Sequence, residues 1–200
     1  MNEIIYGTTN PAKVAQVRSI LEPLGFDVRS LADFDTTLTV EEDGETAEEN
    51  ARKKAIAYAQ ALGKKVLSMD AALYFNDLPD DQQPGLHVRR IHGIERSSDE
   101  EMLAYYTDLA KSMGDRVDAY WRYAFALANP DSTCVSFVHD TPRIFVSEPS
   151  NHIIEGFPLE SIQIDPSSGK YISEMSKEEA ATFWQTSIGV PLTQFVQENY

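Results

Sequence analysis

The sequence has 200 residues, 42% of them hydrophobic, which is enough for one sizeable core, and we expect a single α/β domain over residues 1–200 with two lobes. A net charge of −15 disfavours nucleic-acid binding, and no apolar run approaches the roughly 20 residues that a bilayer requires. With no signal-peptide pattern and with Cys134 as the single cysteine, we expect a cytoplasmic protein without disulfides that does not bind membranes.

The first predicted elements are a strand, a polar turn and a helix. Residues 3–7 form a short apolar run that predicts a buried strand. Asn10 is a good helix N-cap, and Pro11 suits the first helical position, so a helix begins here. A helix N-terminus with nearby donors favours phosphate binding, although an ordinary capped helix with a solvated lysine explains the same pattern. The candidate donors are Thr8, Thr9, Asn10 and Lys13.

The next predicted elements present two candidate metal ligands. A capping box at residues 46–49 predicts a helix to about residue 62, and residues 66–69 predict a buried strand that ends at Asp70. An aspartate between two apolar segments needs a partner or a function. With Glu41 from the preceding acidic segment, Asp70 forms a candidate Mg²⁺ site. The alternative is that Asp70 caps a turn and the glutamates are solvated.

The second half of the chain changes from helical periodicity to alternation. A polar, proline-containing loop is expected over residues 76–85, and helices are expected over residues 98–113, 176–184 and after Pro191. Alternating apolar residues predict a meander of antiparallel strands over residues 118–127, 134–139, 143–147 and 153–155. The order of elements predicts an α/β fold with a mixed, strongly twisted sheet, flanking helices and two lobes around a cleft.

Five stretches match the motifs of one family in order and spacing. Residues 8–13 resemble T/S-x-N-x-x-K, and residues 41–55 are similar to E-E-x-G-x-T-x-x-E-N-A-x-x-K-A. Residues 69–73, 84–90 and 156–160 stand where the same family has D-D-S-G-L, P-G-x-x-S-A-R and G-F-G-Y-D. The chain therefore resembles the inosine triphosphate pyrophosphatase (Ham1) family over most of its length.

The resemblance implies an activity and a set of site residues. Members cleave nucleoside triphosphates to monophosphate and pyrophosphate with Mg²⁺, favour deaminated purines such as ITP, dITP and XTP, and are usually dimers. It implies that Glu41 and Asp70 are metal ligands and that Asp70 is catalytic, because it helps to activate the attacking water. The candidate substrate-binding residues are Thr8, Thr9, Asn10, Lys13, Phe157 and Glu160.

The chain departs from the family pattern where the base would be recognised. The first aspartate of D-D-S-G-L is Met69, and the lysine and S-H-R near the family's C-terminal end align with Ala180 and residues 184–186. A site that loses hydrogen-bonding groups loses discrimination, so we expect altered or weakened base preference. Phe157 and Trp184 either stack on a base or pack in the core.

Two other functions stay open at this point. One is a phosphohydrolase that acts on a different phosphorylated metabolite. The other is a catalytically degenerate nucleotide-binding protein, which the missing lysine and S-H-R favour and the retained Lys13, Glu41 and Asp70 oppose.

Overall fold

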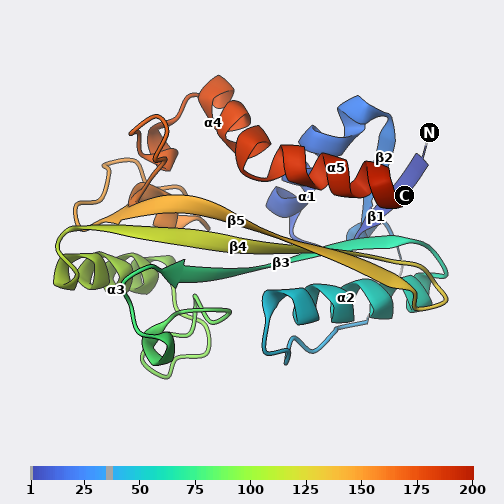
Figure 1. Cartoon of the computed structure of the whole chain (residues 1–200), viewed down its shortest axis with the longest axis horizontal. Helices are drawn as coiled ribbons and strands as arrows, with labels where there is room; N and C mark the ends of the chain where they lie inside the picture. The colour runs from blue at the N-terminus through green and yellow to red at the C-terminus, as the bar shows by residue number, and fades with distance from the viewer. Residues whose placement is uncertain (1, 35–37) are drawn as a thin grey trace. The chain divides into compact units, whose positions relative to one another are not determined.

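A computed structural model describes residues 2–34 and 38–200 and contains a sheet with strand order β2-β1-β3-β4-β5-β6 (Figure 1). β1 pairs in parallel with β2 and β3, whereas β5 and β6 pair antiparallel, so the sheet is mixed, as predicted. The strands are β1 Asn2–Tyr6, β2 Phe26–Ser30, β3 Val66–Phe75, β4 Arg116–Ala128, β5 Cys134–Val146 and β6 Gln163–Ile164.

Five α-helices flank the sheet in the described part of the chain. They are α1 Pro11–Leu21, α2 Ala47–Leu62, α3 Asp99–Ser112, α4 Lys177–Trp184 and α5 Val190–Asn199. The predicted N-caps explain where α2 and α3 begin, but the capping box of α2 is incomplete, because the Glu49 carboxylate accepts from the Glu45 N–H and not from that of Thr46. The Thr46 hydroxyl accepts a hydrogen bond from the Glu49 N–H at 3.1 Å, and Ser98 and Glu101 cap each other at the start of α3. Gly63 ends α2 with a φ of 61°, a left-handed conformation that favours glycine.

Contacts divide the chain into two compact units. Unit 1 draws on Met1–Ala71, Tyr123–His139 and Gln185–Tyr200, and unit 2 comprises Ala72–Arg122 and Asp140–Trp184. In unit 1, α2 lies on one side of the strands, and α1 and α5 lie on the other (Figure 1).

The core of unit 2 forms between α3 and strands β3 to β5. Phe75, Tyr106 and Phe145 are each almost fully buried, and their rings lie within 6.3 Å of one another, centroid to centroid. The Tyr106 hydroxyl donates a hydrogen bond to the Val88 carbonyl at 3.0 Å, which satisfies this buried polar group.

Three predictions about strands were wrong. β3 does not end at Asp70 but continues to Phe75, because the buried carboxylate finds a partner on α2 and the following apolar residues continue the ladder. The expected strand at 153–155 is not formed, and this stretch is irregular backbone that leads to Gly156. The two expected strands from residue 134 to residue 147 are one continuous strand, β5.

None of the helices within residues 2–34 and 38–200 combines the length and apolar character needed to cross a bilayer.

Candidate active site

The turn between β1 and α1 is built by side chains that bond to their own backbone. The Asn10 carboxamide oxygen accepts hydrogen bonds from the N–H groups of Ala12 at 2.9 Å and Lys13 at 3.3 Å. The Thr8 hydroxyl accepts from the Asn10 N–H at 3.2 Å. Asn10 is therefore the predicted N-cap, and it occupies two of the backbone donors that would otherwise face an anion. Thr9 and Asn10 are exposed, which leaves the Thr9 hydroxyl and the Asn10 NH₂ group accessible to a ligand.

Asp70 lies in the middle of β3 and faces a lysine of α2. The Lys54 ammonium lies 3.3 Å from the Asp70 carboxylate and 3.0 Å from the Glu42 carboxylate. The side chains of Lys54 and Asp70 are only 10% and 14% exposed, so this ion pair is largely shielded from water. A buried pair of this kind is costly to break, since removing either partner leaves an uncompensated charge.

The acidic segment is fixed on α2, and this places Glu42. The buried Asn50 side chain accepts a hydrogen bond from the Gly44 N–H at 2.8 Å, and Lys53 pairs with Asp43 at 2.6 Å. Because Asn50 and Lys54 are one turn apart on α2, the segment passes beside Lys54. Sequence reasoning missed Lys54 and Glu42. A signal was available, because Lys54 falls on the apolar face of α2 with buried Ala51 and Tyr58, where a lysine needs a counter-ion.

Lys13 belongs to the same electrostatic cluster. Burial lowers the pKa of its ammonium, and the positive charge of Lys54 lowers it further, while Asp70 and Glu42 act in the opposite direction. Burial also raises the pKa of the Asp70 carboxyl, and the Lys54 ammonium partly offsets this. The structure thus gathers two lysines and two carboxylates, with Lys13 and Asp70 together as the sequence predicts.

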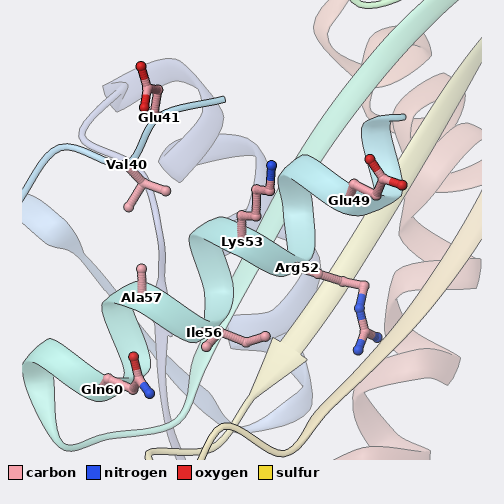
Figure 2. A pocket seen from close by; sticks show the side chains of 8 residues that line it. All are labelled: Val40, Glu41, Glu49, Arg52, Lys53, Ile56, Ala57 and Gln60. Atoms are coloured by element: carbon pink, nitrogen blue, oxygen red, sulfur yellow. The ribbon is translucent and has the colours of Figure 1, made fainter. Parts of the chain in front are cut away.

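Glu41 lies elsewhere, on an open groove beside α2. Figure 2 shows its carboxylate pointing away from the side chains of α2. The groove has a volume of ≈ 510 Å³ and includes Lys53 and Arg52 in its lining. The negative charge of Glu41 acts on Lys53. Of the two adjacent glutamates, Glu42 therefore shares a cation with Asp70, and the role of Glu41 as a metal ligand stays a prediction.

The donor set fits a metal that arrives with a phosphorylated ligand. Within residues 2–34 and 38–200, no three acidic, histidine or cysteine side chains gather closely enough to form a metal cage of their own. Mg²⁺ seldom needs one, because it is commonly held by one or two carboxylates together with phosphate oxygens and water. Asp70 and Glu42 provide two carboxylates, and burial of Asp70 makes a second cation nearby favourable.

Phe157 and Glu160 lie in unit 2, at the start of the short 3₁₀ helix Pro158–Ser161. The Phe157 ring is 40% exposed, so in this structure it is not a core residue. Burial raises the pKa of the Glu160 carboxyl to about 7, against the attraction of the Arg143 guanidinium. Burial of the carboxyl is offset only in part by the Arg143 charge, so a ligand that brings a hydrogen-bond donor would stabilise its ionised form.

Trp184, one of the residues aligned with the missing S-H-R, packs against neighbouring side chains. Trp184 ends α4 and packs edge-on against Phe183, at 4.9 Å between centroids. The Arg143 guanidinium lies 4.4 Å from the Phe183 ring centroid and 6.0 Å from that of Trp184. Of the two roles left open for Trp184, the structure shows packing with Phe183 and Arg143.

A strand–turn–helix together with a largely buried Lys54–Asp70 pair and a second lysine is an arrangement typical of α/β proteins that bind phosphorylated ligands. The sequence matches the Ham1 family over residues 4–185. The chain belongs to this family.

Proteins of similar sequence and of similar structure support this family assignment. The chain is 31% identical to a dITP/XTP pyrophosphatase of Bacillus subtilis, covering 90% of this chain and 88% of the relative. It is 33% identical to one from Exiguobacterium sibiricum, with 90% and 88% covered. A HAM1 protein from Coxiella burnetii superposes with a TM-score of 0.81 over 99% of this chain and 100% of its own, at 23% identity. The Ham1 protein of Staphylococcus aureus gives a TM-score of 0.78 over 100% of both chains, also at 23% identity. These likenesses confirm the predicted fold.

Proposed function

We propose that this chain hydrolyses deaminated purine nucleoside triphosphates, such as ITP, dITP and XTP, to the monophosphate and pyrophosphate. Family membership and relatives described as dITP/XTP pyrophosphatases support this activity. The observation that carries it is the ion-paired cluster of Lys54, Asp70 and Glu42 next to Lys13, in which Lys54 and Asp70 are largely buried. A triphosphate needs cations along its chain, and hydrolysis needs a carboxylate to accept a proton from water.

In this proposal the triphosphate lies against the β1–α1 turn. Thr8, Thr9 and Asn10 offer side-chain donors, and Lys13 offers a full charge. Lys54 is the second cation, and its 10% exposed side chain loses little further freedom when it meets a phosphate oxygen. The raised pKa of the Asp70 carboxyl brings it closer to the range in which a carboxylate is an effective general base.

The divalent metal in this proposal is Mg²⁺, held by Asp70 with Glu42 or the originally predicted Glu41. A bound Mg²⁺ neutralises phosphate charge in the transition state. Without substrate, the Lys54 ammonium pairs with both carboxylates and Lys13 adds a second positive charge nearby, so we expect the fold to form without metal.

Phe157 and Glu160 are the proposed contacts of the base. An exposed ring offers a stacking surface, and an ionised Glu160 accepts a hydrogen bond from a purine. Hypoxanthine and xanthine carry an N1–H donor, whereas adenine has an acceptor at that position. Guanine also carries N1–H, and the charges missing at Ala180 and residues 184–186 remove other means of discrimination. We therefore expect a broadened preference among 6-oxopurines and discrimination against ATP.

We further propose a cytoplasmic homodimer that binds neither nucleic acid nor membrane. The family resemblance supports the dimer, and the net charge of −15 opposes contact with nucleic acid and anionic lipid. Light scattering of the purified protein tests the oligomeric state.

Pyrophosphate release tests the activity. The purified protein is incubated with Mg²⁺ and ITP, XTP, GTP or ATP, and pyrophosphate is measured. Release from ITP and XTP in excess of ATP is the expected result, and no release from any triphosphate would refute the activity. Binding of ITP without turnover supports instead the degenerate nucleotide-binding protein that the missing C-terminal charges favour.

A further inference from the structure

Both backbone groups of Gly156, the residue just before Phe157, form hydrogen bonds with one ion pair. The Gly156 N–H donates a hydrogen bond to the Asp99 carboxylate at 2.6 Å, and the Gly156 carbonyl accepts one from the Arg89 guanidinium at 3.2 Å. Arg89 and Asp99 are joined to each other at 3.0 Å. Three charge-assisted hydrogen bonds thus join Arg89, Asp99 and the Gly156 backbone in a closed ring, which we call the Gly156 clamp.

These hydrogen bonds hold a segment that has no regular secondary structure. Residues 152–157 belong to no helix or strand, and Gly156 has a φ of 82°, which permits the turn into Phe157. The far end of the segment is held separately, since the Ser150 N–H donates to the Ser161 carbonyl at 2.8 Å. The Gly156 clamp ties this turn to the start of α3 and, together with the hydrogen bond from the Phe157 N–H to the Ile154 carbonyl at 3.0 Å, sets the direction in which Phe157 leaves the loop.

Both charged residues come from elements that are themselves fixed. Asp99 is the first residue of α3, where a carboxylate is favoured by the helix dipole. The Arg89 guanidinium also donates to the Ser97 carbonyl at 3.3 Å, which ties it to the entry of the same helix. The side chains of Arg89 and Asp99 are 33% and 34% exposed, so the clamp is partly shielded from solvent.

We propose that Arg89 and Asp99 are positioning residues that fix Phe157 and Glu160 for recognition of the base. This inference rests on the proposed function, in which those two residues contact the base. Neither Arg89 nor Asp99 touches the substrate in this account. A preordered loop binds its ligand without the entropic cost of ordering, so loss of the clamp weakens base-dependent binding and leaves the phosphate chemistry intact.

The test compares a substrate that has a base with one that lacks it. Arg89→Met and Asp99→Asn are assayed with ITP and with ribose 5-triphosphate, with Arg96→Met and Glu100→Gln as exposed controls from the same loop and helix end. We expect KM for ITP to rise roughly tenfold in each clamp variant, as a small displacement of a binding segment produces, with kcat/KM for ribose 5-triphosphate within about twofold of the parent. The KM of the double variant for ITP is expected to be no higher than that of either single variant, because both substitutions break the same clamp.

Several results would refute the proposed positioning role of Arg89 and Asp99. One is an unchanged KM for ITP in a variant whose thermal melting matches the parent. Another is an equal loss on both substrates, which marks a general structural role. Calorimetric binding of IMP and ribose 5-phosphate gives the same comparison if the parent shows no turnover. In that case the proposed activity is refuted. The positioning role of the clamp is supported if Arg89→Met weakens the binding of IMP but not that of ribose 5-phosphate, and it is refuted otherwise.

Discussion

Glu160 makes stability depend on pH in a direction that is opposite to that of most carboxylates. Burial raises its pKa from 4.5 to about 7, so the folded state binds its proton more tightly than the unfolded state does. Its contribution to stability is therefore fully present below pH 4.5 and is lost as the pH rises through 7. A shift of this size corresponds to at most about 3 kcal/mol.

Glu160→Gln removes this dependence while keeping the shape of the side chain. Urea unfolding, followed by tryptophan fluorescence at pH 4.5 to 8, gives the free energy of unfolding of the parent and the variant. We expect the free energy of unfolding of the variant to rise relative to that of the parent as the pH rises, by up to about 3 kcal/mol over this pH range. Glu155→Gln, an exposed neighbour, is the control and should show no such trend. A constant difference between Glu160→Gln and parent, or a gain on acidification, would refute the burial argument.

The remaining predictions concern the phosphate end of the site. Lys54→Met is expected to lower the free energy of unfolding by about 3 kcal/mol, because it leaves the Asp70 carboxylate without its ion-pair partner. By the same denaturation assay, Lys53→Met, which breaks an exposed pair, is expected to change the free energy of unfolding little. Asn10→Ala removes the cap of α1 and should cost about 1 kcal/mol, and an unchanged melting temperature would contradict the capping role. Chelation with EDTA should stop pyrophosphate release yet leave the melting temperature of the free protein unchanged. A large drop in that temperature would show that a metal holds the fold together.

The elements with strong local signals were the ones that could be predicted. α2 begins at the Thr46 N-cap, α3 begins at a capping box, α1 begins at Asn10 and Pro11, and the mixed sheet follows from the change of periodicity. The fate of β3 was not local, because only a tertiary contact with α2 lets a strand continue through a charged Asp70.

The site was predicted in part for the same reason. Lys13 and Asp70 were correctly expected to come together, but the choice between Glu41 and Glu42 depends on how Asn50 fixes the acidic segment. The clamp on Gly156 joins residues far apart in the chain, and neither motif spacing nor periodicity carries that information.

Pyrophosphate release from ITP by the parent and by Asp70→Asn tests the central claim most directly. Asn keeps the size of the side chain but removes the charge that the account needs for the metal and the attacking water. The account predicts Mg²⁺-dependent release by the parent and a loss of at least about 100-fold in kcat for the variant, with ITP binding retained. Release by Asp70→Asn at the rate of the parent would contradict it.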